Sequence, residues 1–284
     1  MSRFSIAGMQ LEVHAKDNVD EICSELISLK RRFPWLDMAL APELASYGAG
    51  VKHAQPRGGP AEQAYQAAAR EAGLWFIPGS IYETDGADVF NSAPVITPDG
   101  EIIASHRKIY PFLPYEKDVA TGSSITVFDV PDVGRFGLSI CYDMWFPETT
   151  RAMACAGAEV ILHPSLTNTI DRDAELAIAR ASAATNQCYF FDINCGPPVG
   201  YGRSIVAGPG GEVLHQAGDA KEIIAIDVDL DLVRRIRQEG WNRLGQQLKS
   251  FRDTEIDYPI YQERTKAPFL NTLGTLELPG KPKA

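Results

Sequence analysis

A cysteine, Cys141, stands between an apolar strand predicted over residues 136–140 and a helix predicted to begin at Pro147. Backbone N–H groups and the helix dipole at such a junction favour a thiolate, which is the reactive form of cysteine. The N–H of Tyr142 is close enough to stabilise an oxyanion formed on a bound substrate. A buried structural thiol is the alternative, because most cysteines in folded proteins are packing residues. We therefore treat Cys141 as a candidate nucleophile.

Two more reactive side chains follow predicted strands. Glu43 comes directly after the short strand predicted over residues 37–41, and is either an acid near a cleft or a solvated loop residue. Lys108 begins a loop that contains two prolines, three aromatic residues and then Glu116. A single lysine is usually a solvated charge, but rigid aromatic loops commonly line small-molecule pockets.

His163 is the alternative base, because a Cys–His pair is the usual machinery of thiol enzymes. It ends the strand predicted after the Cys141 helix. The adjacent Pro164 and the combination of an acid with Lys108 make it the weaker candidate.

The three segments Pro-Glu43, Arg-Lys108 and Ile-Cys141-Tyr-Asp-Met-Trp-Phe-Pro-Glu together resemble the nitrilase, or carbon–nitrogen hydrolase, superfamily. Two downstream segments are also similar to the family, namely Arg180-Ala-Ser-Ala-Ala-Thr-Asn and the glycine-turned hairpin over residues 202–214. The resemblance covers roughly residues 3–262 and implies a carbon–nitrogen hydrolase domain over 1–262 with a C-terminal tail over 263–284.

The resemblance implies an α+β fold, the four-layer αββα sandwich of two mixed sheets covered by helices. It also implies homodimers or larger homo-oligomers, with the tail at an oligomer interface, and no cofactor. By similarity, Glu43 is the general base, Lys108 stabilises the tetrahedral intermediate, and Cys141 is the nucleophile. Glu116 resembles the additional glutamate that positions substrate in amidases of the superfamily.

The residues after Cys141 favour one branch. Cys-x-Asp followed by Phe-Pro-Glu is similar to amidases and carbamoyl hydrolases, whereas nitrilases usually show Cys-Trp-Glu. The resemblance therefore implies an amidase that converts a small amide to an acid and ammonia through a cysteine thioester. The alternatives are an N-carbamoyl-amine amidohydrolase and then a nitrilase. A non-catalytic binding protein on the same fold is the alternative of a different class.

Several aromatic side chains near these motifs could bind substrate. An ordinary core position is the alternative for each of them. The candidates for the pocket are Tyr47, Phe112, Tyr115, Tyr142 and Trp145, with Leu166 beside them.

The elements that must position these residues alternate between strands and helices, with hairpins between them. Apolar spacing predicts helices over residues 18–33, 60–73, 147–156, 171–186 and 230–238. Strands are predicted over residues 3–9, 37–41, 75–82, 160–163, 188–194 and 223–228. This order predicts mixed sheets with helices on their outer faces.

Composition excludes several functional classes. The 284-residue chain has 27 basic and 37 acidic side chains, a formal charge of −10, which argues against nucleic acid or an anionic membrane as a partner. It contains no apolar run near the roughly 18 residues of a membrane helix, and its start leaves no room for a signal peptide. Five scattered cysteines and five scattered histidines predict neither disulfides nor a metal site. We expect a cytoplasmic protein acting on a small molecule.

Overall fold

The computed structural model describes residues 3–113, 115–262 and 268–276. Its first sheet contains eight strands. Seven of them lie in the order β14 (Glu222–Asp229), β1 (Arg3–Gln10), β2 (Met38–Leu40), β4 (Trp75–Ile77), β6 (Asp88–Ile96), β5 (Ile81–Asp85) and β3 (Gln55–Pro56). The eighth, β7 (Ile102–Arg107), pairs with β6. The second sheet has the order β13 (Val213–Gln216), β12 (Ile205–Ala207), β11 (Tyr189–Asn194), β10 (Val160–Ser165), β9 (Gly134–Leu138) and β8 (Thr126–Val130).

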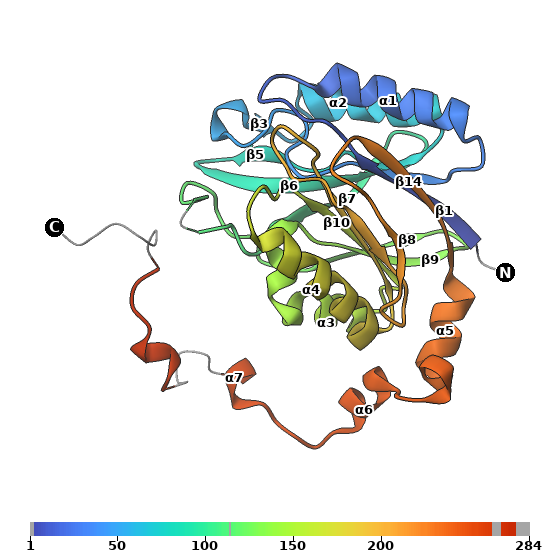
Figure 1. The fold of residues 1–284 in the computed structure, drawn as a ribbon. Helices are drawn as coiled ribbons and strands as arrows, with labels where there is room; N and C mark the ends of the chain where they lie inside the picture. Colours follow the sequence, from blue (N-terminus) through green and yellow to red (C-terminus); the bar gives the residue numbers. More distant parts are fainter. Residues whose placement is uncertain (1–2, 114, 263–267, 277–284) are drawn as a thin grey trace.

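Helices cover the outer faces of both sheets (Figure 1). Helices α1 (Val19–Arg32) and α2 (Pro60–Ala72) lie on the first sheet, and α3 (Pro147–Cys155) and α4 (Asp171–Asn186) lie on the second. Four later helices are α5 (Leu230–Glu239), the 3₁₀ helix η3 (Trp241–Arg243), α6 (Gln247–Asp253) and α7 (Pro259–Gln262). Further 3₁₀ turns are η1 (Val51–His53), η2 (Cys141–Trp145) and η5 (Leu270–Thr272).

Alternating side chains build the four layers. In β1, Phe4 and Ile6 enter the core between the two sheets, whereas Ala7 and Met9 face α1 and α2. In β10, Leu162 enters the same central core, and Ile161 faces α3 and α4. Successive side chains of a strand point to opposite faces, so a strand that is covered on both sides is expected to be apolar on both faces. The predicted αββα sandwich of two mixed sheets is therefore confirmed.

The parallel strands at the centre of each sheet place the turns of the site at the carboxyl edge of the strands. β1, β2 and β4 run parallel in the first sheet, and β9, β10 and β11 run parallel in the second. The flanking strands are mostly antiparallel. Because parallel strands share a carboxyl edge, the turns after β2, β9 and β10 can form one site.

The single strand predicted over residues 75–82 is wrong, because the chain breaks into β4 and β5. Pro78 and Gly79 separate the two strands, and Gly79 has a φ of +80°. A Cβ at Gly79 would lie 1.7 Å from the carbonyl oxygen of Pro42, so only glycine fits there. The break places Ser80 where its hydroxyl accepts a hydrogen bond of 3.2 Å from the N–H of Leu44. This turn supports the segment that carries Glu43.

The other predicted helices and strands agree with the structure to within about two residues. The strand predicted over residues 160–163 is β10, which continues through Pro164 to Ser165, beside β11. Among the described residues, no helix is both long and apolar enough to span a lipid bilayer.

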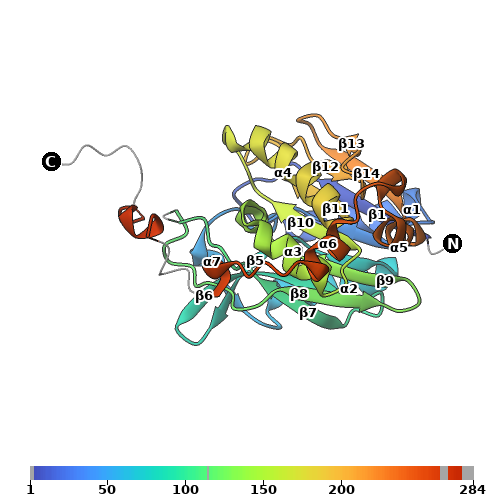
Figure 2. The same cartoon turned by 90° about the horizontal axis from the view of Figure 1, so that it is seen from below.

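Beyond α5 the chain leaves the sandwich and runs along the α3 and α4 side of the molecule (Figures 1 and 2). Leu230 and Val233 of α5 still belong to the central core. Among the described residues past that helix, ten large apolar side chains are exposed, namely Leu244, Phe251, Ile256, Tyr258, Ile260, Tyr261, Phe269, Leu270, Leu273 and Leu276. The predicted tail over 263–284 lies outside the described residues except for 268–276. The division at residue 262 stays a prediction.

Candidate active site

Cys141 occupies a strained turn at the carboxyl edge of the second sheet. It opens η2 three residues after the end of β9 and has a φ of +45°. Leu44, which directly follows Glu43, has a φ of +50°. Left-handed backbone at a non-glycine residue costs roughly 1 kcal/mol or more and is concentrated at functional sites. The two strained turns bring the thiol and the Glu43 carboxylate together from different sheets.

The Glu43 carboxylate is 2% exposed and has three hydrogen-bond donors. Its Oε1 accepts from Asn91 Nδ2 at 2.8 Å and from Lys108 Nζ at 2.9 Å. Its Oε2 accepts from the N–H of Leu166 at 3.0 Å, and the Cys141 thiol is within hydrogen-bonding reach of the carboxylate. The acid is therefore held in one orientation beside the sulfur.

Lys108 lies between two carboxylates. Its Nζ is 2.9 Å from Glu43 Oε1 and 2.7 Å from Glu116 Oε2, and the residue is 2% exposed. The backbone of Lys108 is fixed by the carbonyl of Asn91 and by the N–H of Gly122. A Cβ at Gly122 would lie 2.0 Å from the Arg107 carbonyl oxygen, so glycine is required for this close approach. We call Glu43, Lys108 and Glu116 the catalytic cluster.

Burial sets the protonation of this cluster. Burial raises the pKa of Glu43 above its ordinary value, although the Lys108 charge opposes the shift. Burial alone would lower the pKa of Lys108, but the negative charges of Glu43 and Glu116 outweigh it and raise that pKa. Lys108 is therefore a permanent cation, and Glu43 binds a proton more readily than an exposed carboxylate does.

The thiol of Cys141 is protonated at rest, contrary to the expectation of a thiolate. Burial and then the negative charge of Glu43 raise its pKa well above the ordinary value, and the Lys108 charge and the N–H of Leu166 only partly offset them. The 3₁₀ turn that follows is only five residues long and its dipole is correspondingly small. A protonated thiol needs a base, and Glu43 is beside it.

Asp143 joins the two loops of the site and was not among the predicted site residues. Its Oδ1 accepts from the N–H groups of Ile109 and Tyr110 at 3.0 and 2.9 Å. Its Oδ2 bonds the N–H of Ile140 at 3.0 Å and His106 Nε2 at 2.9 Å. One buried carboxylate thus fixes the spacing between the Lys108 loop and the Cys141 turn.

Comparison with known protein families shows where this chain belongs. A model of the carbon–nitrogen hydrolase family matches residues 12–238. The chain belongs to the carbon–nitrogen hydrolase family. The omega-amidase NIT2 of Homo sapiens is 30% identical over 260 residues, which is 84% of this chain and 93% of the relative. The corresponding protein of Danio rerio is 28% identical over 259 residues, with the same coverage.

Solved hydrolase structures have the same fold. Nit3 of Saccharomyces cerevisiae, described as a member of branch 10 of the nitrilase superfamily, has a TM-score of 0.76 at 26% identity, covering 83% of this chain and 93% of its own. An amidase from Nesterenkonia sp. has a TM-score of 0.74 at 25% identity, covering 83% of this chain and 94% of its own.

In this carbon–nitrogen hydrolase, His163 does not have the position of a base. It is buried, its Nδ1 is 2.7 Å from the Ser139 hydroxyl, and its ring packs on Phe190. Burial lowers its pKa to about 4, so the imidazole is neutral at physiological pH. The ring faces the α3 and α4 side of the second sheet, whereas Glu43 approaches Cys141 from the first sheet.

Four of the five predicted pocket aromatics form one group beside Cys141. Phe112 stacks on Tyr115 with centroids 5.1 Å apart and contacts Tyr142 at 4.9 Å. Tyr142 in turn contacts Trp145 at 6.2 Å. Because the N–H of Phe112 donates to Glu116 Oε2 at 2.6 Å, this aromatic group is tied directly to the catalytic cluster.

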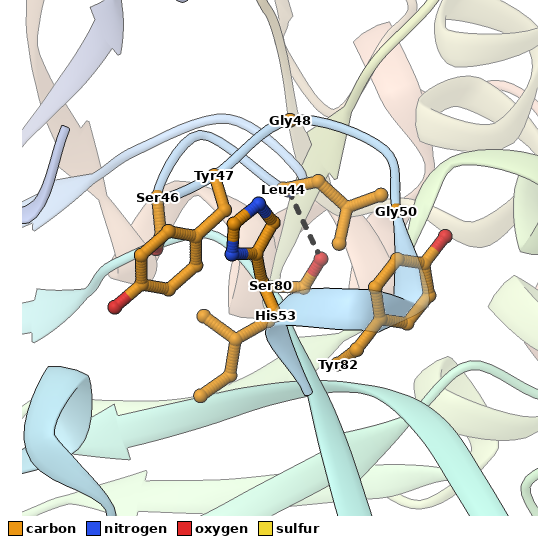
Figure 3. Close-up of a pocket in the computed structure, with 9 residues that line it drawn as sticks. Leu44, Ser46, Tyr47, Gly48, Gly50, His53, Ser80 and Tyr82 are labelled. Carbon is orange, nitrogen blue, oxygen red and sulfur yellow. Dashed lines mark hydrogen bonds between the residues drawn. The ribbon is translucent and has the colours of Figure 1, made fainter. Parts of the chain in front are cut away.

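The fifth aromatic, Tyr47, lies in a separate small pocket (Figure 3). It stacks on His53 with centroids 5.1 Å apart, and its hydroxyl accepts from Gln55 at 2.8 Å. The cavity volume is about 10 Å³, which is room for one water molecule. This pocket borders the catalytic cluster only through Leu44 and Tyr82, so Tyr47 is set apart from the other aromatics.

Asn91 and the backbone of Leu166 are contacts of Glu43 that sequence reasoning missed. The available signal for Asn91 was the polar pair Asn91-Ser92 inside a largely apolar strand. The N–H of Leu166 carries no signal in its residue type. Within the described residues there is no cluster of three His, Cys, Asp or Glu side chains suited to a metal ion.

Proposed function

We propose that this carbon–nitrogen hydrolase is an amidase that converts a small linear amide to a carboxylic acid and ammonia. The observation that carries the proposal is the buried Glu43–Lys108 ion pair beside the Cys141 thiol. An amide carbon is a poor electrophile, so the reaction needs a base for the thiol and a cation for the developing oxyanion. The amidase relatives support the same class of substrate.

The first half of the reaction forms a thioester. Glu43 takes the thiol proton as Cys141 Sγ bonds to the carbonyl carbon, and the carbonyl electron pair moves onto oxygen. Lys108 and the N–H of Tyr142 stabilise that oxyanion. Two of the three Lys108 ammonium hydrogens bond Glu43 and Glu116, which leaves the third for the substrate oxygen. Collapse breaks the C–N bond, and Glu43 gives its proton to the departing ammonia.

The second half hydrolyses the thioester. Glu43 takes a proton from water while the water oxygen bonds to the carbonyl carbon. Collapse breaks the C–S bond, the acid leaves, and the sulfur takes its proton back from Glu43. Each cycle consumes one amide and one water and restores the starting protonation state.

We assign Glu116 to substrate positioning and the aromatic group to the pocket wall. Glu116 is the second acid on Lys108, and its Oε1 is 3.3 Å from Tyr82 Oη and from Asn91 Nδ2. A site of three charged groups beside stacked rings suits a small amide with an apolar substituent.

Ammonia release from a panel of aliphatic and aromatic amides, N-carbamoyl compounds and nitriles tests the proposal. Wild type is compared with Cys141→Ala and with the control Cys155→Ala, which removes an exposed thiol outside the site. We expect release from amides that is lost only in Cys141→Ala. Activity confined to carbamoyl compounds or nitriles would replace the amidase assignment. Activity that survives Cys141→Ala would discard the nucleophile, and a panel that yields no ammonia would favour a binding protein.

We also propose that the protein is a cytoplasmic homo-oligomer. The exposed apolar side chains after α5 support association with a second copy, since such groups are costly in water. Sedimentation of wild type is compared with a variant in which Ile256, Ile260 and Phe269 are serine, and with the control Ile170→Ser. We expect dissociation only in the triple variant. Five free cysteines support a reducing compartment, which cell fractionation tests.

A further inference from the structure

Asn91, in the middle of β6, contacts three of the four residues assigned to the reaction. Its Nδ2 is 2.8 Å from Glu43 Oε1 and 3.3 Å from Glu116 Oε1. Its backbone carbonyl accepts the N–H of Lys108 at 2.8 Å. Asn91 is fully buried, so these contacts are made in the absence of bulk solvent.

The side chain of Asn91 is poorly suited to a purely stabilising role. Its Oδ1 has no hydrogen-bond partner among the described residues, although the residue is buried. An unpaired buried carbonyl oxygen is unfavourable, whereas a leucine of similar size would leave no oxygen unpaired. The benefit of the amide therefore lies in the two bonds that its Nδ2 donates to carboxylates.

We infer that Asn91 is a positioning residue that holds the Glu43 and Glu116 carboxylates toward Lys108 and favours the ionised form of the Glu43 base. The inference rests on the proposed function, because it assigns Asn91 through Glu43. A hydrogen bond donated to a carboxylate stabilises its charged form. Two carboxylates face one ammonium here, so the amide donor offsets part of the excess negative charge.

The charged and titratable groups around Glu43 come from every neighbouring element. Lys108 follows β7, Glu116 lies in the loop after it, and Tyr82 of β5 is within 3.3 Å of Glu116. Cys141 faces Glu43 from η2, and Glu175 of α4 acts electrostatically on that thiol. Cys195, directly after β11, donates its thiol to the Glu43 carbonyl oxygen at 3.4 Å. Removing the Asn91 donor leaves all of these in place, so the change in the proton affinity of Glu43 has a single source.

The experiment compares wild type with Asn91→Leu, Asn91→Asp and the control Ser92→Ala. Ser92 is buried on the opposite face of β6, where its hydroxyl bonds Glu83. Three quantities are measured: the pH profile of kcat/KM for ammonia release, the pH profile of Cys141 alkylation by iodoacetamide, and Tm. Alkylation is followed by mass spectrometry of the Cys141 peptide, with the exposed Cys155 as an internal reference.

For Asn91→Leu we expect kcat/KM at neutral pH to fall about tenfold or more, since bonds to charged groups are stronger than neutral ones. The acid limbs of both profiles should move up by about one pH unit. Tm should stay the same or rise, and Ser92→Ala should leave both limbs unmoved. Asn91→Asp removes the same donor and adds an acid, so its limbs should move in the same direction and further. If the leucine variant does not fold, unmoved limbs in Asn91→Asp overturn the inference.

Unmoved acid limbs in a folded Asn91 variant would overturn the inference, as would an activity loss that only follows a fall in Tm. An equal shift of the acid limbs in Ser92→Ala would overturn it too, because the shift would then come from a general disturbance of β6 and not from the loss of the Asn91 donor. If wild type hydrolyses no amide, the proposed function fails, while the alkylation profiles still decide the role of Asn91.

Discussion

Two buried clusters in this protein have the same composition, each with two carboxylates and one cation. The catalytic cluster joins Glu43, Lys108 and Glu116. The second, which we call the α4 cluster, consists of Arg172, Glu175 and Asp192. In both, the cation bonds the two acids at 2.7–3.0 Å.

The clusters differ in what surrounds them. Protein groups enclose the α4 cluster: Ser165 donates to Asp192, Thr167 donates to Glu175, and Arg172 also donates to the carbonyl of Arg203. The planar guanidinium donates to Glu175 and to the Arg203 carbonyl and forms an ion pair with Asp192, as arginine does in structural ion pairs. The catalytic cluster instead has a compact ammonium, with the Cys141 thiol beside Glu43.

Burial and charge composition therefore do not identify the reactive cluster. What distinguishes it is a nucleophile within reach of one acid and an ammonium hydrogen left for substrate. The α4 cluster supports the segment after β10, which includes the N–H of Leu166 that bonds Glu43. Under the proposed function, the catalytic cluster performs the chemistry and the α4 cluster supports the backbone at Leu166.

The largest expected effect is on catalysis and separates the clusters directly. Glu43→Gln should lower kcat/KM about a thousandfold or more, because an amide can neither take the thiol proton nor return it. Its Tm should change little, since the glutamine oxygen still accepts from Lys108. The matched variant Glu175→Gln should keep most of the activity. Equal losses in the two variants would contradict the distinction; steady-state kinetics with thermal unfolding measure both.

The sequence was sufficient to select Glu43, Lys108 and Glu116, which the structure brings together. Glu43 and Lys108 lie next to strand ends within family motifs, Glu116 was selected by resemblance alone, and the catalytic roles of all three stay predictions. The sequence was also sufficient for the layers, because β1 and β10 are apolar on both faces. The α4 cluster was not predicted. Arg172 and Glu175 read as ordinary charges on a helix, and only the packing of α4 against β11 brings Asp192 to them.

The other two features that the sequence did not predict correctly also depend on tertiary contacts. The break between β4 and β5 depends on a Pro42 carbonyl far away in sequence, and that contact excludes any residue but glycine. The protonated state of Cys141 depends on burial and on Glu43, whereas the local strand–helix pattern indicated a thiolate.

The second expected effect is on stability. Arg172→Met should reduce the free energy of unfolding by about 3–5 kcal/mol, because two buried carboxylates lose their cation. Chemical denaturation measures it. The control is the triple variant Arg172→Met, Glu175→Gln, Asp192→Asn, in which no carboxylate is left unpaired and stability should partly recover. A single variant as stable as wild type would show that the α4 cluster is not a structural ion pair.

The third effect is a pH dependence beside the α4 cluster. The pKa of His163 is about 4 in the folded protein and near 6.5 when unfolded, so between these values only the unfolded chain binds the proton. The free energy of unfolding should therefore fall as pH drops from 6.5 to 4 and level off below, by up to roughly 3 kcal/mol.

Replacing the histidine isolates this contribution. His163→Gln should lose that part of the pH dependence while retaining amidase activity at neutral pH. The measurement is the difference between wild-type and variant stability at several pH values, in which the titration of other groups largely cancels. A variant that folds but releases no ammonia would instead restore His163 as a catalytic base.

The smallest effect tests whether the two clusters are coupled. Thr167→Val keeps the side-chain shape but removes the 3.0 Å bond to Glu175, so the free energy of unfolding should fall by about 1 kcal/mol. If the α4 cluster shapes the backbone at Leu166, kcat should fall a fewfold while KM changes little, because the N–H that orients Glu43 lies one residue away. The control Thr185→Val removes an exposed hydroxyl bond to the α4 backbone. Its kcat should equal that of wild type. If the kcat of Thr167→Val also equals that of wild type, the α4 cluster contributes to stability alone.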